Sequence, residues 1–186
     1  MTDLEILPAE GHTRMRWSNG GGWTTEIIAV PSSRHWDWRL SVADVESAGP
    51  FSVFPGVDRS IALLRGAGFA LTVGEGDEQV VDAPFQPFDF SGDASTSCRL
   101  IDGPVQDLNL MTTRSSVPRR LEFVHIAPLT EVELNDVELV VVVAGRVRLG
   151  RHDLGYLDAI RCDTHPRLVT LTAVGDDAVV AAVCAG

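Results

Sequence analysis

Clustered histidines are absent from this 186-residue sequence, although it contains five of them. No two lie within three residues of each other: they are His12, His35, His125, His152 and His165. Iron, manganese and nickel need several nitrogen or oxygen ligands on one face of a site. We therefore predict no metal, and we expect these histidines to lie on the surface or in loops.

Cysteine is scarce, and no C-x-x-C pair occurs. The three cysteines are Cys98, Cys162 and Cys184. An odd, scattered set argues against a disulfide framework and favours reduced, buried thiols in a cytoplasmic protein. The G-x-S-x-G motif of a serine nucleophile is also missing, so we predict no catalytic residue of this kind.

Long apolar runs are missing as well. One of the longest, Leu139 to Ala144, is far too short to span a bilayer. The first residues, MTDLEILPAEGH, are acidic and have no apolar centre, so we expect no signal peptide. The net charge of −11 disfavours binding to nucleic acid or to a membrane surface. It does not exclude an anionic ligand, because one buried arginine can dominate a local site.

Helical periodicity is absent beyond about three turns, whereas short β-branched runs separated by turn signals are frequent. In GPFSVFPGVDRSIALLRGAGFALTVG, residues 49–74, the apolar runs 61–64 and 69–73 flank Arg65-Gly66-Ala67-Gly68. We interpret this segment as a β-hairpin. Many short strands at close spacing predict an all-β sandwich or barrel.

The sequence divides near its middle. The segment VVVAGRVRLG, residues 141–150, resembles LLRGAGFALTVG, residues 63–74, when Gly66 is aligned with Gly145, an offset of 145 − 66 = 79 residues. The stretch RSSVPRR, residues 114–120, is the best linker candidate. We predict two barrels, residues 1–113 with the pocket and residues 114–186, with the division near 112–121.

Asp58 and Arg59 have no obvious local use at the start of a strand. They could form a salt bridge that fixes the preceding turn. Alternatively, Arg59 points into the barrel and offers its planar guanidinium to a carboxylate, oriented by Asp58. The residue types alone do not decide between the two.

A second candidate group surrounds the glycine triplet of residues 20–22. Asn19 and the glycine amides could line a small polar site, or Asn19-Gly20 could be only a turn. Thr25 could be a ligand contact or only a strand former. Glu26 in a β-branched strand needs exposure or a partner such as Arg39 or Arg59. Arg39 and Ser41 alternate with Trp38, Leu40 and Val42, so both could face the cavity.

Five motifs, in order, resemble the signature of the HutD/Ves family. They are W-S-N-G-G-G-W-T-T-E-I (17–27), W-R-L-S-V-A-D-V (38–45), G-P-F-S-V-F-P-G-V-D-R (49–59), F-D-F-S-G-D (88–93) and D-L-N-L-M (107–111). The resemblance implies a bicupin, that is, two fused cupin-type β-barrels. It also implies an association with bacterial histidine utilisation and a cytoplasmic protein without known catalytic chemistry. Ser18 departs from the lysine expected after the tryptophan.

With this resemblance, the interpretation favours a regulator that binds a small carboxylate of the formylglutamate kind without catalysis, cofactor or metal. The alternative is a metal-independent cupin enzyme, an isomerase or hydrolase, with Glu26 or Asp58 as general base. A homodimer is left open. Trp17, Phe88 and Met111 are expected in the wall or core. The predicted ligand-binding set is Asn19, Gly20, Gly21, Thr25, Glu26, Arg39, Ser41, Asp58, Arg59, Phe88 and Asn109.

Overall fold

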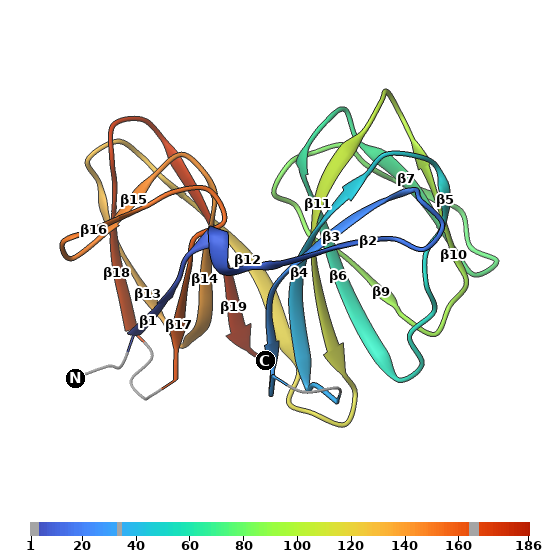
Figure 1. The fold of residues 1–186 in the computed structure, drawn as a ribbon, viewed down its shortest axis with the longest axis horizontal. Helices are drawn as coiled ribbons and strands as arrows, with labels where there is room; N and C mark the ends of the chain where they lie inside the picture. The colour runs from blue at the N-terminus through green and yellow to red at the C-terminus, as the bar shows by residue number, and fades with distance from the viewer. Residues whose placement is uncertain (1–3, 33–34, 164–167) are drawn as a thin grey trace. The chain divides into compact units, whose positions relative to one another are not determined.

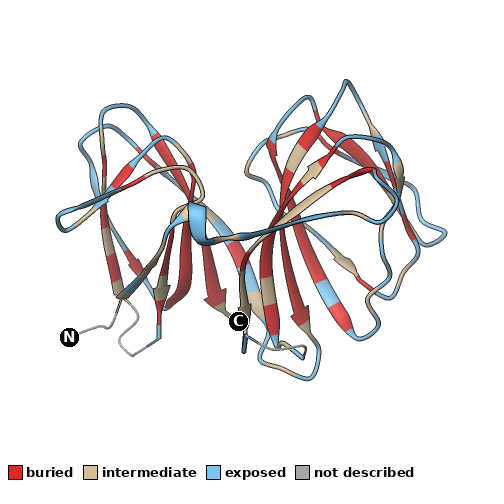
Figure 2. Ribbon diagram, viewed as in Figure 1, coloured by how far each residue is buried: buried red, intermediate tan, exposed pale blue. Residues whose placement is uncertain are grey.

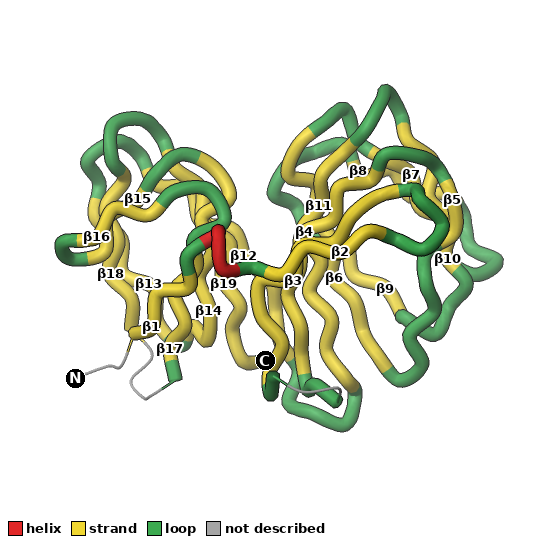
Figure 3. The backbone as a smooth tube through the Cα atoms, viewed as in Figure 1, coloured by secondary structure: helices red, strands yellow, loops and turns green. Residues whose placement is uncertain are grey.

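The chain is an all-β protein, as its strand and turn signals predicted. The computed structural model describes residues 4–32, 35–163 and 168–186, in which strands account for nearly all regular structure (Figure 1, Figure 3). The helical exception is one 3-10 turn, η1, at Ala9–Gly11. Across the described residues, no helix has the length and apolar character needed to cross a membrane.

Two compact units make up the chain. One comprises Thr13–Pro118, and the other combines Met1–His12 with Arg119–Gly186. The break at Pro118 lies within the range 112–121 where a division was expected. The expected range 1–113 nevertheless differs from the Thr13–Pro118 unit at its N-terminal end. The first residues belong to the second unit, where β1 (Leu4–Leu7) pairs with β17 (Ala159–Cys162).

The Thr13–Pro118 unit contains two antiparallel sheets. In the order of pairing, the six-stranded sheet consists of β2 (Thr13–Arg16), β3 (Gly22–Val30), β4 (Trp38–Val45), β11 (Val105–Thr113), β6 (Val57–Arg65) and β9 (Phe88–Ser91). The four-stranded sheet consists of β5 (Gly49–Pro50), β10 (Thr96–Leu100), β7 (Phe69–Val73) and β8 (Glu78–Val81).

The second unit also contains two antiparallel sheets. Its five-stranded sheet consists of β1, β17, β14 (Val137–Ala144), β19 (Ala178–Ala185) and β12 (Arg119–Ile126). Its four-stranded sheet consists of β13 (Glu131–Asn135), β18 (Leu168–Ala173), β15 (Val147–Leu149) and β16 (His152–Leu154).

The two units repeat one strand order. In the first, the order β4-β11-β6-β9 is accompanied by β5-β10-β7-β8. Advancing every label by eight gives β12-β19-β14-β17 and β13-β18-β15-β16, the orders found in the second unit. Strands β2 and β3 extend the first repeat and β1 extends the second. The weak sequence match between the halves therefore corresponds to a repeat of topology.

Each unit has its own apolar core between its sheets, and buried residues follow the strands (Figure 2). In the Thr13–Pro118 unit, Ile61 and Leu63 of β6 pack with Phe69 and Leu71 of β7. In the second unit, Val140 and Val142 of β14 pack in a core with β18 and β19. Alternate residues of each strand supply these cores, because successive side chains point to opposite faces.

The predicted hairpin at residues 61–73 is wrong, although both of its strands exist. β6 pairs with β11 and β9, whereas β7 pairs with β10 and β8, so the turn between them passes from one sheet to the other. Gly66, at φ +101°, makes this passage possible, since a Cβ there would lie 2.7 Å from the carbonyl oxygen of Pro104. β14 and β15, on either side of Gly145, likewise belong to different sheets.

Candidate functional site

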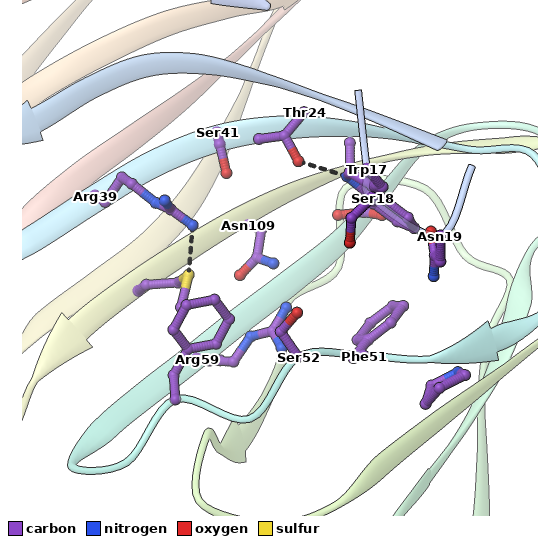
Figure 4. Close-up of a pocket in the computed structure, with 15 residues that line it drawn as sticks. Trp17, Ser18, Asn19, Thr24, Arg39, Ser41, Phe51, Ser52, Arg59 and Asn109 are labelled. Carbon is purple, nitrogen blue, oxygen red and sulfur yellow. Dashed lines mark hydrogen bonds between the residues drawn. The ribbon is translucent and has the colours of Figure 1, made fainter. Parts of the chain in front are cut away.

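A cavity of about 230 Å³ lies in the Thr13–Pro118 unit. Its walls come from β3, β4, β6 and β11 of the six-stranded sheet and from the segments before β3 and β6. In Figure 4, the labelled side chains of Arg39, Arg59 and Asn109 project into the same space. Residues far apart in sequence therefore form one site within one unit.

Strand alternation explains how β4 and β11 contribute to the wall. Arg39 and Ser41 of β4 line the cavity, and so do Asp107 and Asn109 of β11. The register pairs Ser41 with Asn109, so these polar groups lie side by side across the sheet. The intervening residues of both strands, such as Leu40, face away and are buried. The prediction that Arg39 and Ser41 share a cavity-facing side is thus confirmed.

Arg59 is a buried cation held among aromatic rings. Only 6% of its surface is exposed. Its guanidinium carbon lies 5.2 Å from the ring centroid of Phe51, 5.7 Å from that of Phe54 and 4.8 Å from that of Phe90. These contacts stabilise a partly desolvated cation. Among the described residues, Arg59 Nε finds no hydrogen-bond acceptor.

Arg59 remains charged despite this burial. Desolvation lowers its pKa to about 10, Asp107 opposes this effect, and nearby Arg39 adds to it. A pKa of about 10 still leaves the guanidinium protonated at neutral pH. The cavity therefore presents a permanent positive charge with an unused donor, which is an arrangement suited to a carboxylate.

Asp107 faces the same cavity and is 1% exposed. Within the described part of the chain, neither of its carboxylate oxygens accepts a hydrogen bond. Burial raises the pKa of Asp107 to about 7; Arg59 lowers it and Asp44 adds to the rise. Burial, with Asp107 adding to it, also raises the pKa of the Cys98 thiol to about 12, so that cysteine is an inert thiol.

Arg39 is the second arginine of the cavity. Its Nη2 donates a hydrogen bond to Met111 Sδ at 3.3 Å, and its Nη1 lies 3.8 Å from Glu26 Oε2. The expected pairing of Glu26 with Arg39 is therefore present. Desolvation lowers the pKa of Arg39, and Glu26 opposes this effect. Arg39 Nε has no hydrogen-bond partner among the described residues.

The turn at residues 17–21 forms one edge of the cavity. Trp17 Nε1 donates to Thr24 Oγ1 at 2.8 Å, and the Gly21 amide donates to Asn19 Oδ1 at 2.9 Å. Asn19 lines the cavity as predicted, but Gly20 and Gly21 do not. The close approach expected at the glycine triplet occurs at Gly22. A Cβ there would lie 2.2 Å from the Asp44 carbonyl oxygen, so the neighbour is a strand and not a ligand.

Asp58 does not orient Arg59, contrary to the sequence interpretation. Neighbours in a strand point to opposite faces, and Asp58 is exposed. Its Oδ1 accepts a hydrogen bond from Arg114 Nε at 2.7 Å. Arg114 also pairs with Asp93, whose Oδ1 accepts from the Gly56 amide at 2.8 Å. This network anchors the segment that carries Phe51 and Phe54 over Arg59.

The structure brings together five of the eleven predicted residues. Asn19, Arg39, Ser41, Arg59 and Asn109 line the cavity. Six others do not: Gly20, Gly21, Thr25, Glu26, Asp58 and Phe88. Thr25 pairs with Val42 on the opposite side of the sheet. Phe88 pairs with Ile61, two positions beyond Arg59 along β6, and packs in the core.

Sequence reasoning missed Thr24, Phe51, Phe54 and Asp107. Thr24 and Thr25 are identical residues on opposite faces, so the pattern gives no choice between them. Asp107 could have been found, because it lies two residues before Asn109 in a strand that alternates polar and apolar residues. Trp17 and Met111, which were expected in the wall or core, line the cavity.

The four histidines that the structure describes take no part in this cavity. His35, His125 and His152 are exposed, and His12 Nε2 is 2.8 Å from the carbonyl oxygen of Leu157. His165 lies outside the described residues. Among those that are described, no three His, Cys, Asp or Glu side chains are grouped so as to hold a metal ion. All three cysteines are buried and free.

The second unit has apolar residues at the positions equivalent to Asp107 and Asn109. The offset of 145 − 66 = 79 residues places Ile61 at Val140 and Leu63 at Val142. In the first unit Ile61 pairs with Asn109 and Leu63 with Asp107, whereas Val140 pairs with Ala182 and Val142 with Val180. The second repeat thus has apolar residues at the places of Asp107 and Asn109, whereas the same offset places Arg59 at Glu138.

Comparison with known proteins identifies close relatives. A family model described as HutD matches residues 9–181. An uncharacterised 21.2 kDa protein in the hutC 3' region of Pseudomonas putida is 40% identical over 125 residues, 66% of this chain and 65% of that protein. Protein Ves of Cronobacter sakazakii is 42% identical over 99 residues, 53% of this chain and 54% of that one. The chain thus spans about half to two thirds of these curated relatives.

Solved structures extend the comparison over the whole chain. HutD from Pseudomonas fluorescens SBW25, in a structure described as a formate condition, is 32% identical with a TM-score of 0.81, covering 99% of this chain and 100% of that one. Two further neighbours are cupin-like and show the fold alone. Oxalate decarboxylase of Bacillus subtilis is 8% identical with a TM-score of 0.71, covering 100% of this chain and 78% of that one. A bacterial pirin of Escherichia coli is 10% identical with a TM-score of 0.70, covering 98% of this chain and 99% of that one.

Proposed function

The chain belongs to the HutD family, as its five motifs predicted, and from this premise we propose that it binds a small carboxylate of the formylglutamate kind in the cavity around Arg59. In this proposal it acts in the regulation of histidine utilisation by sequestering or sensing that acid, without catalysis. The name of the Pseudomonas putida relative, which refers to a hutC region, supports the link to this pathway.

One observation carries the proposal. Arg59 is a buried, permanently charged guanidinium that faces a cavity and has an unused Nε–H donor. An arginine in this state requires an anionic or strongly accepting partner, and Asp107 does not form an ion pair with it within the described residues. A bound carboxylate would supply that partner. Ser41, Thr24 and Asn109 would add neutral hydrogen bonds from the same wall.

The proposal includes a bicupin architecture. It is supported by the shared strand order of β4–β11 and β12–β19 and by cupin-like neighbours aligned over nearly the whole chain. In this architecture the first repeat binds the ligand. The second repeat has apolar side chains at the positions of Asp107 and Asn109.

Calorimetry with small acids tests the proposal. Formate, glutarate and N-formyl-L-glutamate are titrated into the wild-type protein, Arg59→Ala and Arg59→Lys. Removing a charge-assisted, bidentate contact should weaken binding by about 2–5 kcal/mol. Arg59→Lys should recover only part of this loss, because an ammonium group does not present the planar fork of a guanidinium.

Arg99→Ala is the matched control for this experiment. It removes the same charge from the same unit, but Arg99 is exposed and pairs with Glu78 at 2.6 Å, outside the cavity. Circular dichroism verifies folding of every variant. If Arg59→Ala binds the acids as the wild type does, the pocket lies elsewhere; if no acid binds the wild type, carboxylate binding is wrong.

A second candidate function is acid–base catalysis on a small acid. The observation that favours it is Asp107, a cavity-facing carboxyl group whose pKa is raised by burial to about 7. Such a pKa suits a general acid or base. Asp58, considered for this role from sequence, points away from the cavity. Mass spectrometry of each acid after prolonged incubation distinguishes the candidates, because only an enzyme would change the mass or isomer content of the acid.

A further inference from the structure

A guanidinium and a carboxyl group face the cavity without pairing with each other. Arg59 is 6% exposed, Asp107 is 1% exposed, and both line the cavity wall. They do not form an ion pair or a hydrogen bond together within the described part of the chain. The cavity thus contains a desolvated guanidinium and a desolvated carboxyl group, each with unused hydrogen-bonding atoms.

The unused atoms are of both kinds. Arg59 Nε and Arg39 Nε are donors without acceptors, while Asp107 Oδ1, Asp107 Oδ2 and Asn109 Oδ1 are acceptors without donors among the described residues. Asn109 is 8% exposed and lies two residues from Asp107 on the same face of β11. Buried polar atoms of this kind are normally hydrogen-bonded. A simple carboxylate has only acceptors, so it satisfies the arginines and leaves Asp107 and Asn109 unsatisfied.

Charge balance leads to the same requirement. When Asp107 is ionised, a simple anion beside Arg59 would place two carboxylates in one desolvated cavity, which is unfavourable because like charges at close range repel strongly there. A ligand that also carries an ammonium group would meet each charge of the wall with its opposite, and one that carries an N–H group would meet the carboxylate with a hydrogen-bond donor. It would also place a donor where Asp107 and Asn109 have free acceptors.

Resting on the proposed carboxylate binding, we infer that the ligand is bifunctional: its carboxylate binds Arg59, and an N–H or ammonium donor of the same molecule binds Asp107 and Asn109. The ligand class is therefore a small amino acid, or an acid with an N–H group, in place of a plain mono- or dicarboxylic acid. Asp107 and Asn109 form a donor-recognising subsite that determines specificity, whereas Arg59 supplies affinity for any acid.

Three acids with one carbon skeleton test this inference by calorimetry at neutral pH. Glutarate has no nitrogen donor, L-glutamate adds an ammonium group, and N-formyl-L-glutamate adds an amide N–H. The wild-type protein should bind at least one of the two nitrogen-bearing acids about tenfold or more tightly than glutarate, since hydrogen bonds to charged groups are worth about 1.5–3 kcal/mol.

Variants assign the preference to the subsite. Asp107→Asn keeps the size of the side chain and removes its charge, and it should reduce the preference for the nitrogen-bearing acid to about threefold or less while glutarate binds at least as tightly as before. Asn109→Ala is the second variant and should also reduce the preference. Arg59→Ala should weaken all three acids alike. Circular dichroism confirms that each variant is folded.

The outcomes separate the two proposals. If glutarate binds the wild type as tightly as both nitrogen-bearing acids, or if Asp107→Asn and Asn109→Ala keep the preference, the donor subsite is wrong while carboxylate binding stands. If none of the three acids binds, carboxylate binding fails and the inference fails with it.

Discussion

At Asp107, burial and a neighbouring guanidinium act on one carboxyl group in opposite directions. Burial is the larger effect, and it raises the pKa of Asp107 to about 7, whereas Arg59 lowers it. An unfolded aspartate has a pKa of about 3.9. The folded protein therefore binds more protons than the unfolded chain between about pH 4 and pH 7.

This difference predicts a pH dependence of stability. The contribution of Asp107 to the free energy of unfolding is fully favourable below about pH 4. It is lost as the pH rises through about 7, because ionisation of the buried carboxyl group costs free energy. The loss is about 4 kcal/mol for a shift of this size. Urea unfolding of the wild type and Asp107→Asn from pH 4 to 8 measures it.

The difference between the two proteins removes the contribution of the other carboxylates, which titrate alike in both. Asp107→Asn should become progressively more stable than the wild type up to about pH 7, and the difference should then stay constant. A difference that does not change with pH would mean that Asp107 is already ionised near its ordinary pKa in the folded protein.

For Arg39 and Ser41, sequence reasoning had a pattern that fixed the strand face, because both alternate with apolar neighbours. The residue types alone did not fix the direction of Arg59, and the family motif favoured its role in the cavity. Phe51 and Phe54 were not inferred, because they lie in an irregular segment between β5 and β6. Their contact with Arg59 depends on tertiary anchoring of that segment by Arg114, which no local pattern shows.

At the scale of elements, the passage between β6 and β7 depends on Gly66. Its φ of +101° is unfavourable for any residue with a Cβ, and an added Cβ would meet the Pro104 carbonyl oxygen at 2.7 Å and Val105 Cγ1 at 2.9 Å. We predict that Gly66→Ala lowers the free energy of unfolding by about 3 kcal/mol or more, from backbone strain and steric overlap together.

Gly103→Ala is the matched control. Gly103 also has a positive φ, +76°, but a Cβ there would meet no heavy atom within 4 Å. Gly103→Ala should therefore lower the free energy of unfolding by only about 1 kcal/mol, the cost of the unfavourable backbone conformation alone. Thermal or urea unfolding compares both with the wild type. Equal costs at the two positions would show that the chain relaxes around Gly66 and that the close approach is unimportant.

Strand positions could be predicted from sequence more readily than strand partners. The apolar runs at 61–64 and 69–73 correspond to β6 and β7, yet the short turn between them was interpreted as a hairpin. A two-sheet unit allows the same turn to connect strands of opposite sheets. Which sheet accepts each strand is decided by long-range pairing with β11 and β10, and this information lies far away in sequence.

At the scale of the whole molecule, one strand order occurs twice, but the second repeat has apolar residues at the places of Asp107 and Asn109. Strands β2 and β3 and the turn before β3 also add Trp17, Asn19 and Thr24 to the wall of the cavity. Neither β2 nor β3 has a counterpart in the strand order that the two units share. The sequence indicated the repeat through the match around Gly66 and Gly145. It did not indicate that residues 1–12 join the later unit, because a short edge strand carries no signal of its partner.

The central claim is that Arg59 holds the ligand carboxylate, and NMR of the arginine side chains tests it most directly. The chain has 15 arginines and no lysine, so Arg59→Lys identifies the Arg59 Nε–Hε signal by its disappearance. When N-formyl-L-glutamate is added to the wild type, this signal should shift downfield as the unused donor gains an acceptor, and saturation should occur at one ligand per chain. Binding that leaves the Arg59 signal unchanged would contradict the claim.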